Sequence, residues 1–179
     1  MTRFRIRRRA LVGVVLGFVL TAALAACGES EADAPVAADP PGPVDAQVGG
    51  TVDRGGANIT LTEVGATRSF GSFDNAEPGF MFISAYFKVQ NSGTGSINLD
   101  PEVMTLELAG GGTGIARQAA PAARLANAGP APGAEERGWR SWEVPEGTRA
   151  ATISYKPTAD TEIRFGVIVP TEIRERWRV

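Results

Sequence analysis

The sequence predicts an all-β protein, an antiparallel β-sandwich preceded by a signal peptide and a disordered linker. Three observations lead to this fold class. From residue 51 onward, short runs of alternating apolar and polar residues are separated by Gly, Pro and Asn turns, as in strands with one buried face. No run in that region repeats apolar residues at the spacing of an amphipathic helix. About seven such runs fall within about 120 residues, which is the strand density of a two-sheet sandwich.

The clearest strand is expected over residues 80–90, which are followed by the turn sequence NSGTG. Alternate side chains of a strand share one face, and one face of this run is apolar. These core-facing residues are Met81, Ile83, Ala85, Phe87 and Val89. Further strands are expected over residues 58–67, 97–99, 102–109, 138–144, 151–156 and 163–169. The sandwich is therefore placed at residues 51–169, with a tail at residues 170–179.

Two segments between these strands lack strand periodicity. Residues 116–134 are rich in Ala and Pro and are expected to form a long loop or a short helix. Residues 110–114 include four glycines, which suggests a phosphate-binding loop, but no Lys-Ser or Lys-Thr pair follows them. We expect a flexible hairpin loop there instead.

Residues 1–26 have the organisation of an export signal. Five arginines lie within the first nine residues, and an apolar stretch follows over residues 11–26. At about 16 residues, this stretch is shorter than the ~20 that cross a bilayer as a helix, so a cleaved signal is favoured over an uncleaved membrane anchor. The pair Arg8-Arg9 loosely resembles a twin-arginine signal, and a merely basic start to the signal is favoured over it.

The sequence LAAC, which ends in Ala26 and Cys27, resembles the lipobox of bacterial lipoproteins. In that family the cysteine thiol receives a diacylglyceryl group, and cleavage before it makes the cysteine the mature N-terminus. The resemblance implies lipidation of Cys27 and cleavage between Ala26 and Cys27. Each acyl methylene adds ~0.8 kcal/mol of membrane affinity, so the chain would be held at the extracytoplasmic face of the cell membrane.

Residues 27–50 are expected to be a disordered linker that begins at the lipidated cysteine. They are mainly Ala, Pro, Gly and acidic residues, with no basic residue and no apolar periodicity. Such a segment cannot bury enough apolar surface to offset the entropy of ordering it. We expect it to space the sandwich away from the membrane surface.

Composition argues against several classes of function. The chain has no His and one Cys, which removes His-based catalytic triads, disulfides and His- or thiolate-bound metal sites. From Cys27 onward there are 13 Lys and Arg against 20 Asp and Glu, a formal charge of −7, which argues against nucleic-acid binding. We therefore expect no enzyme activity and no cofactor.

Two groups of acidic residues are candidate sites. Asp74, Asn75 and Glu77 lie close together before the main strand and offer the hard oxygen ligands of a Ca²⁺ site, although the EF-hand spacing is absent and a solvated turn is favoured. Asp100 and Glu102 flank a proline and suggest an acid–base pair, for which a capped turn is the favoured alternative.

Several aromatic residues fall outside the predicted core face. Phe82 and Tyr86 alternate away from the apolar face of residues 80–90, and Trp139 does so in the strand near residue 140. They are expected either to form a second small core beneath the long loop, which is favoured, or to make an exposed interaction patch. Ile173 and Trp177 share a face if the tail is helical, so Trp177 either docks on the sandwich or joins that patch.

The sandwich region resembles a family of immunoglobulin-like domains of unknown function in Gram-positive surface lipoproteins, related to the immunoprotective antigen sandwich of mycobacteria. The matching segments span roughly residues 49–169, and the most specific are VQNSG, INLDP and WEVPEGT. None of them is a catalytic motif. The resemblance implies a membrane-anchored, non-catalytic binding module whose partner is an unknown protein or envelope component. The alternative is a small-ligand or calcium-binding sensor or carrier.

Overall fold

The computed structural model describes residues 42–172. The signal peptide, Ala26, Cys27, the linker as far as residue 41, and Trp177 lie outside the described residues. The described residues contain strands and no helix, so none of them belongs to a helix that could cross a membrane.

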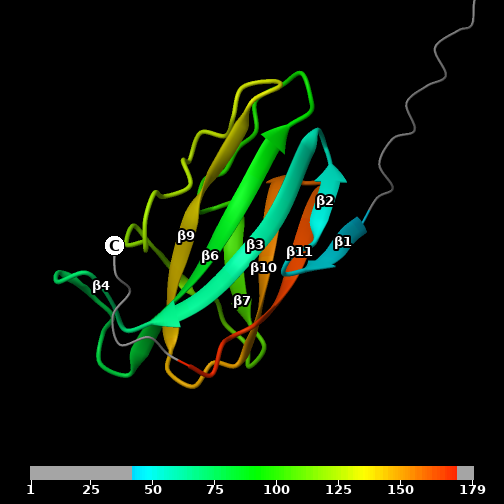
Figure 1. Cartoon of the computed structure of the whole chain (residues 1–179). Coiled ribbons are helices and arrows are strands. Elements are labelled where there is room, and N and C mark those ends of the chain that lie inside the picture. Colours follow the sequence, from blue (N-terminus) through cyan, green and yellow to red (C-terminus); the bar gives the residue numbers. More distant parts are fainter. Residues whose placement is uncertain (1–41, 173–179) are drawn as a thin grey trace, which may run out of the picture. The chain divides into compact units, whose positions relative to one another are not determined.

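Two sheets face each other across one core, and a small ribbon extends from one of them (Figure 1). The four-stranded sheet has the order β1 (Gly42–Gln47), β11 (Thr161–Ile168), β10 (Ala150–Thr158), β7 (Met104–Leu108). The five-stranded sheet has the order β2 (Thr51–Arg54), β3 (Ala57–Thr67), β6 (Phe80–Asn91), β9 (Glu135–Pro145), β8 (Ile115–Arg117). The ribbon pairs β4 (Ser69–Phe70) with β5 (Asp74–Asn75). The predicted all-β sandwich is confirmed.

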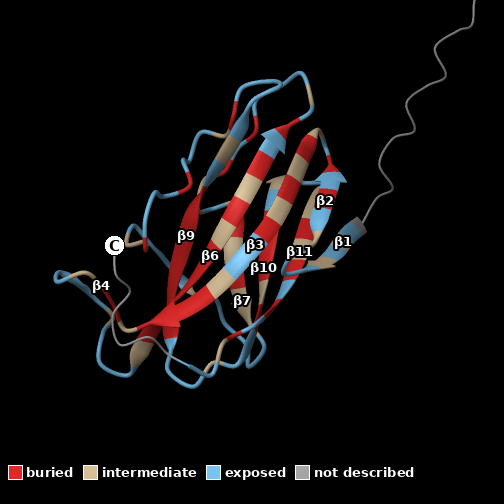
Figure 2. Ribbon diagram, in the orientation of Figure 1, coloured by how far each residue is buried: buried red, intermediate tan, exposed pale blue. Residues whose placement is uncertain are grey.

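The core lies between the two sheets, where the predicted apolar face of β6 is completely buried (Figure 2). Phe87 of β6 meets Phe165 of β11 edge-on across the core, with ring centroids 6.2 Å apart. Trp142 and Val144 of β9 join the same core. Full burial of a large apolar side chain contributes about 1.5–3 kcal/mol, so the period-2 pattern dictates which face of each strand turns inward.

The predicted linker is too long at its C-terminal end, because Gly42–Gln47 forms β1 and pairs in parallel with β11. Val44 and Ala46 pack against the core, while Pro43, Asp45 and Gln47 are exposed. Two apolar residues among Gly, Pro and Asp are too few to reveal the alternation in sequence. Proline is tolerated because β1 is an edge strand. The described part of the sandwich therefore begins at residue 42, and the parallel pairing of β1 with β11 departs from the expected antiparallel arrangement.

Other differences involve short elements. The strand expected over residues 97–99 is reduced to a single bridge between Asn98 and Ala128. Residues 118–134, between β8 and β9, form a long loop with no helix, so the loop alternative is the observed one. Gly111 and Gly112, with φ of 92° and 85°, form the turn after β7, as expected for a hairpin loop.

Candidate functional site

The long loop covers the outer face of β6 and β9, where it buries a second aromatic cluster. Phe70 stacks on Phe82 with ring centroids 5.0 Å apart, and Tyr86 lies 5.1 Å from Trp139. Phe82 and Trp139 are only 3% and 8% exposed, and Ala119 of the loop packs against them. The predicted interaction patch is therefore wrong for Phe82 and Trp139, and Tyr86 is half-buried. The favoured alternative, burial beneath the loop, is observed because the loop and β4 together cover these rings.

The loop is held against β9 by backbone contacts next to Gly138. Leu125 donates its N–H to the Trp139 carbonyl at 2.9 Å, and Trp139 donates its N–H to the Ala123 carbonyl at 3.0 Å. The approach is so close that a Cβ atom on Gly138 would lie 2.5 Å from the Leu125 Cα. Leu125 itself is buried in the main core. Only glycine at this position allows the loop to run along β9.

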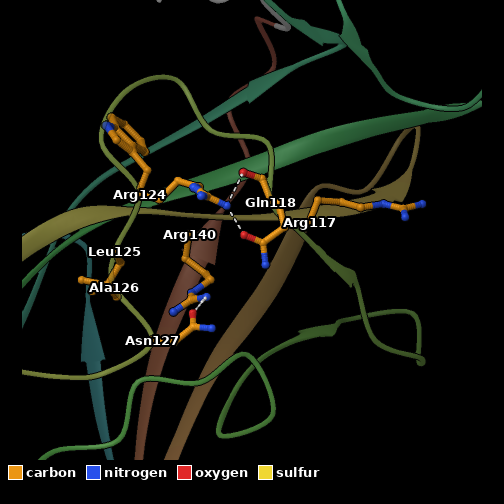
Figure 3. Close-up of a pocket in the computed structure, with 8 residues that line it drawn as sticks. Arg117, Gln118, Arg124, Leu125, Ala126, Asn127 and Arg140 are labelled. Atoms are coloured by element: carbon orange, nitrogen blue, oxygen red, sulfur yellow. Dashed lines mark hydrogen bonds between the residues drawn. The ribbon is translucent and has the colours of Figure 1, made fainter.

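This close approach leaves a polar hollow of about 470 Å³ between the loop and β9 (Figure 3). We name it the arginine hollow. Its lining residues are Arg117, Gln118, Arg124, Leu125, Ala126, Asn127, Trp139 and Arg140. The volume lies within the range of small-molecule sites, about 300–1,000 Å³.

Arg140 of β9 is a buried cation in this hollow, only 6% exposed. Its guanidinium donates to the Leu99 carbonyl at 2.5 Å and to Asn127 Oδ1 at 3.1 Å, while its Nε has no hydrogen-bond partner among the described residues. Among residues 42–172, no carboxylate forms an ion pair with it. Burial lowers the pKa of Arg140, the Asp100 carboxylate opposes that shift, and the charge of Arg124 adds to it. The side chain nevertheless stays protonated at neutral pH.

Arg124, in the loop, also contacts only neutral groups. Its Nη1 donates to Oε1 and to the backbone carbonyl of Gln118. Arg117 lines the same hollow, but in Figure 3 its guanidinium points away from Arg124 and Arg140. Arg124 and Arg140 are thus two cations without a carboxylate partner in the described part of the chain.

Arg117 also lines a neighbouring hollow of about 310 Å³, whose lining includes the predicted calcium ligands. Arg117 donates to Oε2 of the buried Glu143 through Nε at 2.8 Å and through Nη2, and Glu77 donates its backbone N–H to Glu143 Oε1 at 2.7 Å. Asp74 and Asn75 are exposed in β5. No group of three or more His, Cys, Asp or Glu within residues 42–172 is placed to hold a metal ion. The calcium prediction therefore gains no support from this arrangement.

Glu143 provides a prediction about pH. Burial alone would raise its pKa, but the Glu77 N–H and the Arg117 guanidinium lower it below the ordinary 4.5. A folded-state pKa below the unfolded value stabilises the protein above that unfolded value, and the contribution is lost as the pH falls through the folded pKa. We expect Glu143→Gln to lower the free energy of unfolding by about 2 kcal/mol at pH 7, because it loses charge-assisted hydrogen bonds.

Urea unfolding at pH 7 and at pH 3 checks this prediction. The difference between wild type and Glu143→Gln should be largest at pH 7 and should shrink as the pH falls through the folded-state pKa, because the carboxylate then loses its charge. The exposed carboxylate of Glu102 makes no ion pair among the described residues, so Glu102→Gln is the control and should change little. A difference that does not depend on pH would refute the role of the Glu143 charge.

Asp100 and Glu102 occur in a turn before β7. Asp100 accepts the Val103 N–H on its backbone carbonyl at 3.1 Å, and its own N–H is capped by Asn98 Oδ1 at 2.9 Å. Glu102 is exposed. The turn alternative for this pair is therefore the observed arrangement.

Sequence analysis missed the residues of the arginine hollow, although one signal was present. Arg140 falls on the same alternating face of β9 as Trp142 and Val144, which predicts a charged side chain turned toward the core. A buried charge at such a position is uncommon and often functional. Arg124 and Asn127, in contrast, lie in a loop that has no periodicity to mark them.

Comparison with known proteins supports the fold. No family model matches the sequence, and no curated protein matches it. Among solved structures, the chain is similar to the ycdA protein of Bacillus subtilis, described as a candidate lipoprotein, with a TM-score of 0.55 and 14% identity. That match covers 66% of this chain and only 38% of the ycdA chain. The yjhA protein of Bacillus subtilis, covered over 98% of its length, matches 68% of this chain with 15% identity and a TM-score of 0.49.

A third similar structure is an uncharacterised β-sandwich protein of Clostridium difficile, with 10% identity, a TM-score of 0.45 and coverage of 70% of this chain and 96% of that one. At these identities the comparisons concern the fold. The chain is a β-sandwich whose fold resembles that of a candidate lipoprotein.

Proposed function

We propose that this protein is a lipid-anchored lipoprotein of the extracytoplasmic membrane face that acts as a non-catalytic binding module of the cell envelope. Its ligand-binding site is the arginine hollow. The N-terminal sequence is the basis for the anchor, and the described residues are the basis for the binding site.

Arg140 is the observation that carries the binding site. Removing a charge from water without an opposite charge costs several kcal/mol, so unpaired buried cations are uncommon. The two neutral oxygens of Leu99 and Asn127 engage two of the five guanidinium N–H groups. A ligand that enters the hollow would supply an anionic partner in direct contact with Arg140, which no ion pair among the described residues provides.

The lining of the hollow favours binding over catalysis. The chain has no His, and the eight lining residues contain no Ser, Thr, Cys, Tyr, Lys, Asp or Glu side chain. Arginine stays protonated in proteins and is a poor general base. Among the lining side chains, positioning and charge neutralisation are the chemistry that remains.

Support for the anchor comes from the lipobox-like LAAC, the basic start and the acidic linker as far as residue 41. The fold likeness to a candidate lipoprotein agrees with this assignment without testing it. Lipidation at Cys27 would place the sandwich outside the cytoplasm, where an envelope ligand or a small solute is available.

Native mass spectrometry tests this binding site. The full-length protein is extracted from membranes in mild detergent for the measurement. We expect a bound mass on the wild type that is lost in Arg124→Gln, because this exposed side chain contributes charge to the hollow without holding the core. Arg149→Gln removes the same charge from an exposed position outside the hollow and should retain the bound mass. Identical spectra for all three proteins would contradict the assignment.

A further inference from the structure

We infer that the ligand of the arginine hollow is a small oxyanion, which presents carboxylate or phosphate oxygens to Arg124 and Arg140. The inference rests on the proposed function, because it assigns a chemical class to the ligand of that binding site. The basis is the set of hydrogen-bonding groups that the lining side chains still offer to a ligand after their contacts within the protein.

The internal contacts engage the amide oxygens, which are the acceptors among the hollow's lining side chains. Arginine has donors only, so in each contact the neighbouring amide must offer its oxygen. Asn127 Oδ1 accepts from Arg140, and Gln118 Oε1 accepts from Arg124 (Figure 3). The amide nitrogens left over are donors, and neither is hydrogen-bonded within the described part of the chain.

The lining side chains therefore present mainly donors, because each amide oxygen already accepts a hydrogen bond from an arginine. The remaining N–H groups of Arg124 and Arg140 and the amide nitrogens of Gln118 and Asn127 are all donors. A sugar or other neutral polyol carries donors of its own, which would lose water on entry and find only the partly used amide oxygens as side-chain acceptors. A carboxylate or phosphate carries acceptors that match this lining.

Charge supports the same class of ligand. Burial lowers the pKa of Arg140, the Asp100 carboxylate raises it and Arg124 lowers it again, so the positive charge of Arg124 acts against that of Arg140 within the hollow. No carboxylate in residues 42–172 forms an ion pair with either one. An oxyanion between them would attract both guanidinium groups, which bind carboxylate and phosphate in two-pronged geometry. A cationic ligand would be repelled.

The hollow's size limits the ligand to a small molecule or to the terminal group of a larger one. Its volume of about 470 Å³ accommodates more than a bare inorganic ion, and Trp139 provides an aromatic surface in the lining. The same oxyanion chemistry is available from a free organic acid, a free phosphate compound or the phosphate of a membrane headgroup.

Isothermal titration of the full-length, lipidated protein in detergent, at fixed ionic strength, tests the inference. The probes are succinate, inorganic phosphate, glycerol phosphate and, as a neutral compound, glucose. We expect saturable binding of at least one oxyanion and none of glucose. Arg124→Gln should weaken this binding at least about tenfold, the loss of one charge-assisted contact, while Arg149→Gln should leave it unchanged. Preference for glycerol phosphate over phosphate would identify a headgroup-like source, and preference for succinate an organic acid.

Asn127→Asp is the second variant, since it places an internal carboxylate beside Arg140 in a side chain of the same shape. It should raise the melting temperature, because the buried cation gains a charged partner, and should weaken oxyanion binding at least about tenfold. Binding that survives both Arg124→Gln and Asn127→Asp would show an adventitious ion only and overturn the inference. Absence of binding by all three oxyanions would overturn it as well.

These outcomes separate the inference from the proposed function. Native mass spectrometry could show a bound mass that depends on Arg124 while the titration shows binding of glucose or of none of the probes. In that case the binding site is supported and the oxyanion assignment fails. If neither measurement depends on Arg124, both fail.

Discussion

Replacing Gly138 by alanine should detach residues 123–127 from β9 and lower the free energy of unfolding by about 3 kcal/mol. A Cβ atom at this position would lie 2.5 Å from the Arg124 carbonyl carbon and 2.5 Å from the Leu125 Cα. Both are backbone atoms, which cannot move aside as the end of a flexible side chain can. Overpacking costs about 1–3 kcal/mol, and each of the two backbone hydrogen bonds that join Trp139 to the loop adds about 1 kcal/mol when lost.

Urea unfolding gives the size of this effect, and amide hydrogen exchange gives its location. In Gly138→Ala the amides of Leu125 and Trp139 should exchange much faster, while that of Phe87 in the core keeps its protection, because the damage is confined to the loop. The matched control is Gly110→Ala, whose Cβ would meet nothing within 4 Å and whose effect should stay within about 0.5 kcal/mol. Equal stability of the two variants would show that the loop can move away from β9 without cost.

The same substitution connects the fold to the proposed site. Residues 123–127 supply Arg124 and Asn127 to the arginine hollow, so their detachment from β9 separates Arg124 from Arg140. Gly138→Ala should therefore also lose the ligand, although it changes no lining residue. Retained binding in a variant with an exchanging loop would mean that the ligand does not need both arginines.

Replacing Cys27 by alanine should abolish acylation and release the protein from the membrane. With its thiol gone, the chain has no other cysteine to which a diacylglyceryl group could be attached. Two or more acyl chains hold a protein firmly, at ~0.8 kcal/mol for each buried methylene, whereas residues 11–26 alone are too short to span a bilayer comfortably. Incorporation of a palmitate analogue should fall to background, and the fraction that resists an alkaline wash should fall with it.

The control keeps the lipobox pattern. Ala26→Gly retains a small residue before the cysteine and should be labelled and cleaved like the wild type. A Cys27→Ala protein that is still labelled would refute the lipid anchor. A wild-type protein of uncleaved mass that stays in the membrane without any label would instead favour residues 11–26 as an uncleaved anchor.

The sequence allowed prediction where apolar and polar residues alternate along a single strand. The alternation of Met81, Ile83 and Phe87 predicted which face of β6 is buried, because side chains of a strand alternate whatever their partners are. The same alternation set Phe82 and Trp139 apart from the main core. Whether they form an open patch or a second core depended on residues 119–120 of the loop, which are distant in sequence from Phe82.

The sequence was less informative where two segments must meet. β1 contains only Val44 and Ala46 as a pattern, and its pairing with β11 joins residues more than 100 positions apart. Because edge strands tolerate polar residues and proline, composition alone favoured a linker there. The start of the domain was therefore a property of the pairing and not of the local sequence.

By itself, then, the sequence determined the all-β class and the inward face of the long strands, and it supplied the argument for an anchor at Cys27. These follow from local regularities: alternation, turn residues and a motif of four residues. Only the tertiary structure decided that Arg140 of β9 would meet Arg124 and Asn127 of the loop without a carboxylate. The physical reason is that the two arginines come from separate segments of the chain and share one hollow only in the folded protein. That hollow forms only when the loop packs against β9, which Gly138 permits because it has no Cβ atom.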